Sequence, residues 1–241
     1  MKRIFLLVFT IPIFASAQFK GLVKKASESV KQSSSEVSGA LDIGGGLKEA
    51  LQYGVTRQVR KLTATDGFFK NDAVKILMPD ELRKVDKTLR QMGMSSLADE
   101  GVKVLNRAAE DAVKEATPIF VGAITNMSIS DAKNILMARG TPATEYLQNT
   151  TSAALYSKFS PVVQESIGKV GADKIWATII KKYNSLPLVS KVNPDINDYV
   201  TNKAMEGVFK MIAVEENNIR GNFSARTSDL LKKVFALQDR K

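Results

Sequence analysis

Apolar residues recur every three or four positions through most of this chain, which is the spacing of one face of an α-helix. The clearest stripe consists of Leu47, Leu51, Val55, Val59 and Leu62, with charged residues between its members. Alternating apolar and polar residues, the pattern of a half-buried strand, are scarce. The sequence therefore predicts an all-α fold, a single globular domain of about seven to nine helices over residues 47–238.

Proline and polar residues predict where several of these helices begin or break. Pro118 and Pro161 lie inside helical patterns, so we expect two Pro-interrupted helices, the second of them broken just after Phe159. Ser128 and Asp131 have the spacing of a capping box, in which each side chain bonds to the other's backbone N–H. This pair predicts the start of a short helix.

Two further helices and a loop are expected from the same criteria. We expect helices over residues 79–92 and around residues 175–183, and a loop over residues 185–197. The end of that loop is rich in oxygen ligands but lacks the Gly and Glu that an EF-hand requires. Asp195 or Asn197 is therefore expected to cap the following helix instead of binding calcium.

Residues 1–17 have the pattern of a signal peptide. Two basic residues follow Met1, residues 4–14 are mostly apolar, and Ala15-Ser16-Ala17 provides small residues for cleavage before Gln18. The apolar run is too short to span a membrane, and no later run is long enough. The sequence thus predicts an exported protein, periplasmic or extracellular, with no transmembrane segment in the mature chain.

Residues 18–46 are expected to form a basic leader or linker ahead of the helical domain. Lysines surround apolar residues at helical spacing over residues 19–31, and a serine run and Gly44-Gly45-Gly46 follow. One interpretation is a basic amphipathic helix that contacts a membrane surface. The other, which the short apolar face favours, is a frayed terminal helix on a flexible linker.

The chain contains no cysteine and no histidine, which excludes several classes of chemistry. Nucleophilic triads and dyads that use His are excluded, as are the usual zinc, copper, haem and iron–sulfur ligand sets. We therefore expect no cofactor and no metal site. Lys and Arg number 35 against 25 Asp and Glu, and this basic surplus favours an anionic envelope component or a protein partner over nucleic acid.

Five charged residues are candidates for a polar network or a ligand site: Arg107, Glu110, Glu215, Glu216 and Arg220. Glu215 continues the apolar stripe of the last long helix, where a carboxylate must be paired or lie near the surface. Arg107 and Arg220 are its expected partners, and Glu110 is the expected local partner of Arg107 three residues away. We expect ion pairing, with Arg107 and Glu215 in one network, more than a reactive carboxylate.

The chain resembles exported bacterial proteins of domain-of-unknown-function (DUF) family 4197 over about residues 46–235. The likeness rests on the order and spacing of several short motifs: Leu47-Lys48-Glu49-Ala50-Leu51, Thr65-Asp66-Gly67-Phe68, Asn106-Arg107-Ala108-Ala109-Glu110, Asp131-Ala132 with Ile135-Leu136, Tyr146 with Thr150, Tyr199-Val200-Thr201, Glu215-Glu216 with Ile219-Arg220, and Arg226-Thr227 with Asp229-Leu230-Leu231. The resemblance implies an all-helical single domain behind a signal peptide. It implies no activity.

Three functional hypotheses follow from the sequence. The leading one is a non-catalytic binding or structural module of the cell envelope, because no complete catalytic constellation is present. The second is a carboxylate-dependent hydrolase of envelope polysaccharide, for which Glu110 and Glu215 are the candidate pair. The third is a peripheral membrane-surface protein that uses residues 19–31.

Overall fold

A computed structural model provides the structure of this protein. It describes residues 44–78, 95–169, 195–226 and 228–239, with isolated residues between 87 and 93 and between 171 and 191. The expected signal peptide, most of the leader, the helix over 79–92, the helix around 175–183 and much of the loop over 185–197 lie outside the described residues.

The described part of the chain is helical and contains no strand, which confirms the all-α prediction. A helix over residues 44–63 comes first. The elements that follow it are α3 (Ser95–Val113), α4 (Ala116–Asn126), α5 (Ile129–Met137), α6 (Pro142–Gly168), α8 (Ile196–Gly221), the 3-10 turn η2 (Phe223–Ala225) and α9 (Asp229–Asp239).

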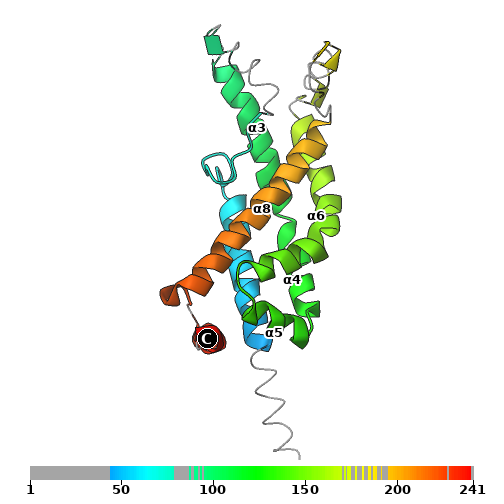
Figure 1. Ribbon diagram of the computed structural model, residues 1–241. Coiled ribbons are helices and arrows are strands. Elements are labelled where there is room, and N and C mark those ends of the chain that lie inside the picture. The colour runs from blue at the N-terminus through cyan, green and yellow to red at the C-terminus, as the bar shows by residue number, and fades with distance from the viewer. Residues whose placement is uncertain are drawn as a thin grey trace, which may run out of the picture. The chain divides into compact units, whose positions relative to one another are not determined.

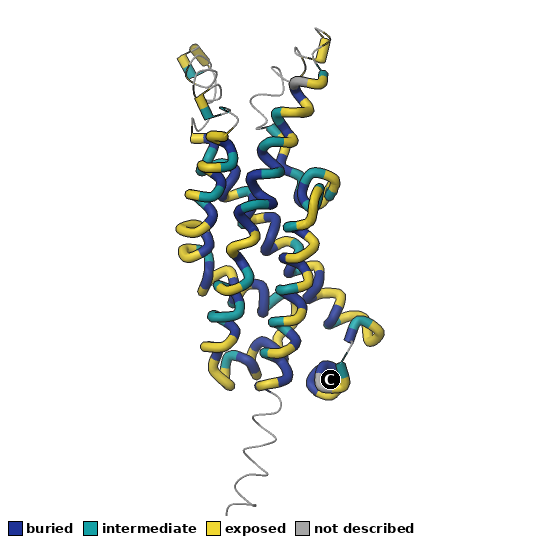
Figure 2. The backbone as a smooth tube through the Cα atoms, turned by 180° about the vertical axis from the view of Figure 1, so that it is seen from behind, coloured by how far each residue is buried: buried dark blue, intermediate teal, exposed yellow. Residues whose placement is uncertain are grey.

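The centre of the bundle is formed by α3, α6 and α8, which pack against one another, while α4 packs against α6. Figure 1 shows α8 as the long orange helix that crosses the bundle diagonally. Phe120 of α4 and Phe209 of α8 meet edge to face in the main core, with ring centroids 5.9 Å apart. Buried residues follow the inward faces of the helices and exposed residues follow their outer faces (Figure 2).

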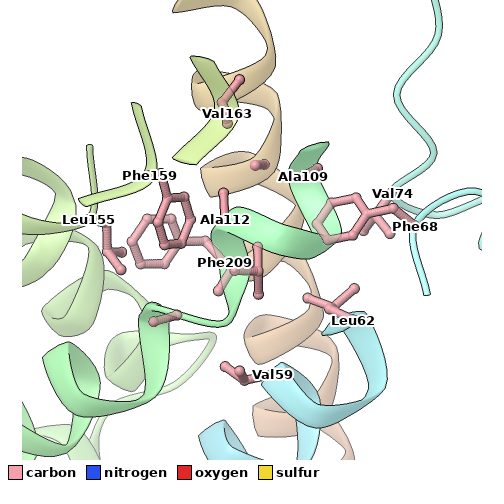
Figure 3. Packing of buried hydrophobic residues seen from close by; sticks show 14 of the residues in the cluster. Val59, Leu62, Phe68, Val74, Ala109, Ala112, Leu155, Phe159, Val163 and Phe209 are labelled. Atoms are coloured by element: carbon pink, nitrogen blue, oxygen red, sulfur yellow. The ribbon is translucent and has the colours of Figure 1, made fainter. Parts of the chain in front are cut away.

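The loop after the first helix is anchored in this core by Phe68 and Val74, which lie together in Figure 3. Phe68 packs against α8 at Gly207, where an added Cβ would lie only 2.7 Å from the Phe68 ring. A glycine at this position of α8 is therefore what allows the loop to approach so closely.

Predicted helix starts are confirmed where polar side chains cap the backbone. Ser128 Oγ accepts a hydrogen bond from the Asp131 N–H at 3.0 Å, and the Asp131 carboxylate accepts one from the Ser128 N–H at 3.2 Å. Asp195 caps α8 by accepting hydrogen bonds from the N–H groups of Asn197 and Asp198. Each cap satisfies N–H groups that the helix itself leaves unpaired.

The structure corrects two boundary predictions. α6 continues through Pro161 to its end instead of breaking after Phe159, because Phe159, Val163 and Ile167 form one fully buried stripe on both sides of the proline. Burial of these side chains outweighs the single hydrogen bond that proline removes. The expected linker glycines 44–46 are the first turn of a helix, and two of the three are buried. Pro118, by contrast, lies in the first turn of α4, where α3 has already ended.

Candidate functional site

Glu110 of α3 holds the turn that follows the first helix. The residue is only 4% exposed, and Oε1 of its carboxylate accepts hydrogen bonds from the N–H groups of Phe68 at 3.0 Å and Phe69 at 3.3 Å. Arg107 donates to the other carboxylate oxygen of Glu110 and, at 2.5 Å, to Asp66. The predicted pairing of Arg107 with Glu110 is confirmed, and it fixes a turn that lies about forty residues away in the sequence.

The charges of this turn stabilise one another. Lys70, through its hydrogen bond, and then Arg107 lower the pKa of the Asp66 carboxyl. The hydrogen bond to Glu110 raises the pKa of Arg107 above its usual value. A Cβ at Gly67 would lie 2.4 Å from a backbone carbonyl oxygen of the preceding helix, so the turn is closed tightly around a glycine. The cluster is a folded connection and leaves little room for a ligand.

Asn106 of α3 holds the extended segment that follows the same loop. Its amide oxygen accepts a hydrogen bond from the Ile76 N–H, and its amide nitrogen donates to the Ile76 carbonyl, both at 2.8 Å. The same nitrogen donates to the Val102 carbonyl at 2.7 Å. Asn106 is fully buried, so these bonds satisfy backbone groups that water cannot reach. Sequence reasoning did not select Asn106 as a site residue, although it lies in one of the motifs on which the resemblance rests.

Glu215 of α8 is held by the first helix and by neither partner that the sequence suggested. Arg57 donates to Oε1 of Glu215 at 3.0 Å, and Gln58 donates to Oε2 at 2.7 Å. The prediction that Arg107 or Arg220 pairs with Glu215 is wrong, and so is the single network of Arg107 and Glu215. The reason is that Arg107 and Arg220 are already committed to Glu110 and Glu216, while the first helix brings its own polar residues to Glu215.

Glu216 of α8 caps the N-terminus of α6 from outside that helix. It accepts hydrogen bonds from the Ala143 N–H at 3.0 Å and from the Thr144 N–H and hydroxyl, both at 2.8 Å. The first N–H groups of a helix have no partner within it, and the helix dipole attracts a negative charge to this end. The carboxylate therefore meets both requirements of the α6 N-terminus.

Arg220 performs the opposite role at the C-terminus of α5. It pairs with Glu216 at 2.8 Å and donates to the backbone carbonyls of Ile135, Leu136 and Ala138. A guanidinium is stabilised beside the carbonyls that end a helix. One turn of α8 thus fastens the α5–α6 connection with two opposite charges. Both side chains are more than nine-tenths buried.

Arg226 makes a comparable clamp between α8 and α9. It donates to the carbonyls of Ile219 and Arg220 at the end of α8 and to both carboxylate oxygens of Asp239 in α9. This hydrogen bonding lowers the pKa of the Asp239 carboxyl. Arg226, like Asn106, was not among the five residues selected from the sequence.

The five candidate residues therefore form three separate clusters with structural partners. A glycosidase would require two carboxylates that face one cleft. Glu215 and Glu216 border a mostly apolar cavity of about 30 Å³, which has room for about two water molecules, and Glu110 does not line it. The described residues contain no group of three or more acidic side chains that could hold a metal ion.

Two larger hollows flank α8 on the surface. The first, of about 470 Å³, lies between α8 and residues 73–78, and the second, also about 470 Å³, lies between α8 and α6. Glu206 and Lys210 of α8 border both. These two hollows have the size of a ligand site, whereas the small cavity beside Glu215 and Glu216 does not.

Comparison with known proteins assigns the chain to a family. None of the described helices combines the length and apolar character that crossing a membrane requires. No curated protein and no solved structure matches the chain. The family described as "Protein of unknown function (DUF4197)" matches residues 38–236, which is most of the chain. The chain therefore belongs to the DUF4197 family.

Proposed function

We propose that this protein is an exported, non-catalytic binding module of the bacterial cell envelope. The observation that carries the proposal is that Glu110, Glu215 and Glu216 are each occupied by fixed donors from other parts of the fold. Carboxylates that hold helix ends and turns are not available to transfer protons to a substrate.

The arrangement of the carboxylates favours a non-catalytic role over hydrolysis of envelope polysaccharide. Glu110 holds the turn after the first helix, whereas Glu215 bonds to that helix itself. A pair of catalytic carboxylates would need a substrate-sized cleft between them, with one of them free to carry a proton. The contacts of both residues instead support a structural role.

The export part of the proposal rests on the sequence of residues 1–17, which has a basic start, an apolar run and a small-residue cleavage motif. The choice of partner rests on charge. The formal net charge of +10 for the full chain becomes +8 once Lys2 and Arg3 are removed with residues 1–17. This positive charge favours an anionic component of the envelope, to which a basic protein is attracted over a long range.

Native mass spectrometry of the protein isolated from the envelope fraction of its own cells tests this proposal. We expect a chain that begins at Gln18 and carries an additional mass, which is released on denaturation. A chain that retains residues 1–17 in the cytoplasmic fraction would contradict export. A bare protein would contradict binding, and cleavage of purified envelope polysaccharide by the wild-type protein would support the hydrolase instead.

A further inference from the structure

The hollow between α8 and residues 73–78 has features that identify the class of its ligand. We propose that this hollow, called here the α8 groove, binds the anionic headgroup of a phospholipid at a membrane surface. This inference rests on the proposed function, because it names the ligand of the proposed binding module. The groove is lined by Ala73, Val74, Lys75, Ile76, Leu77, Met78, Tyr199, Lys203, Glu206, Gly207 and Lys210.

The walls of the groove are held in place before any ligand arrives. Val74 and Phe68 pack against α8 at Gly207, and Asn106 fixes both backbone groups of Ile76. The Tyr199 hydroxyl of α8 donates to the Leu77 carbonyl at 2.9 Å and so ties the two walls together directly. A preformed site binds without the cost of ordering its walls.

The described residues that line the groove carry a net positive charge. Among them, Lys75, Lys203 and Lys210 contribute three cations, and Glu206 contributes one carboxylate, which Lys203 contacts at 2.6 Å. Lys75 lies over the Phe69 ring at 4.5 Å and pairs with no carboxylate among the residues that the structure describes. Lys210 is exposed and makes no ion pair within the described part of the chain. Two cations therefore remain available to an anion.

The rim of the groove adds an apolar contact to these charges. Ile76 points into the core, while its neighbour Leu77 is 58% exposed and Met78 is partly exposed. Amphipathic helices bind the boundary between headgroups and acyl chains with apolar residues beside basic ones, and Leu77 beside the lysines provides a smaller version of this combination. The cations among the described lining residues are lysines, which act as point charges on phosphate. These features favour a phospholipid over an acidic peptide.

Sedimentation with vesicles tests the inference on the mature chain purified from the envelope fraction. The vesicles contain phosphatidylglycerol and phosphatidylcholine in a one-to-three ratio, or phosphatidylcholine alone. The test variant is Lys75→Ala/Lys210→Ala. The matched control is Lys133→Ala/Lys158→Ala, because these lysines are exposed on α5 and α6, line neither hollow beside α8 and remove the same charge. The basic leader is identical in all three proteins.

We expect the wild type to bind the anionic vesicles and not the neutral ones. Because each lysine near an anionic surface strengthens binding by roughly fivefold, the groove variant should bind about 25-fold more weakly. The control variant should lose much less. An equal loss in both variants, or no sedimentation of the wild type, would overturn the inference.

Two further measurements separate the other outcomes. Saturable binding of glycerol 3-phosphate in solution, with no preference for vesicles, would identify a free phosphate compound as the ligand and overturn the membrane assignment. A bound mass in native mass spectrometry without vesicle binding would leave the proposed function standing while the groove inference fails. Unchanged circular dichroism and melting temperature would show that both double variants are folded.

Discussion

The clamp between α8 and the α5–α6 connection can be broken by the substitution Glu216→Ala. The side chain accepts three hydrogen bonds from the start of α6, at 2.8 to 3.0 Å, and pairs with Arg220. Its removal leaves the N–H groups of Ala143 and Thr144 without their acceptor. It also leaves a guanidinium whose side chain is 8% exposed without its counter-charge.

The cost of this substitution follows from the burial of both partners. Removing one member of a buried ion pair costs about 3–5 kcal/mol. Arg220 keeps the α5 carbonyls as acceptors, so the low end, about 3 kcal/mol, is expected. In a domain of this size that corresponds to a decrease in melting temperature of about 6–12 °C. Thermal and urea unfolding followed by circular dichroism measure it.

Two companion variants show whether the charge is the cause. Glu216→Gln keeps the volume and one acceptor but loses the charge, so it should lie between the wild type and Glu216→Ala. Glu100→Ala removes an exposed carboxylate on α3 that makes no ion pair in the described part of the chain, and should change stability by less than about 0.5 kcal/mol. A loss below about 1 kcal/mol in Glu216→Ala would refute the clamp.

Further variants test other parts of the account. Gly207→Ala should cost about 1–3 kcal/mol in urea unfolding, because its Cβ would lie 2.7 Å from the ring packed against it. Gly122→Ala, with open space around it in α4, should instead stabilise by about 0.5–1 kcal/mol. Asn106→Ala should cost about 3 kcal/mol in the same assay, because it leaves two backbone groups of the extended segment unpaired. Arg226 lowers the pKa of Asp239 below its ordinary 3.8, so the stabilisation by this carboxylate is complete well above pH 4 and is lost as the pH falls below it. The difference in melting temperature between wild type and Asp239→Asn should therefore shrink between pH 6 and pH 3, and a constant difference would contradict the pairing.

Local patterns predicted the helices well because helical periodicity and caps are encoded over a few residues. The stripe that begins at Leu47 is buried except for partial exposure of Leu51, and the Ser128–Asp131 capping box is present. The continuation of α6 through Pro161 could not be predicted in this way. It depends on what lies opposite Phe159 and its neighbours in the core, which the local sequence does not contain.

The candidate site was predicted in part. Pairing between residues close together in the sequence could be predicted, whereas pairing between distant residues could not. Arg107–Glu110 is a local pair at helical spacing, and it was predicted correctly. Arg220 was predicted to pair with Glu215 but pairs with the neighbouring Glu216. Arg57 and Glu215 are separated by 158 positions in the sequence. Their pairing depends on which helices are neighbours, and a single sequence does not supply that information. The roles of Asn106 and Arg226 were missed because Asn106 acts on backbone groups, which carry no sequence signal, and because Arg226 joins the carbonyls that end α8 to Asp239 in the next helix.

The central claim is that the buried carboxylates of Glu110 and Glu216 hold backbone groups of distant turns and helix ends in place. Amide hydrogen exchange measures these bonds directly. In the wild type, we expect the amides of Phe68 and Phe69, bound by Glu110, and of Ala143 and Thr144, bound by Glu216, to be protected. In Glu216→Ala, Ala143 and Thr144 should lose protection while Phe68 and Phe69 keep it. Rapid exchange of all four amides in the wild type, or unchanged protection in the variant, would contradict the account.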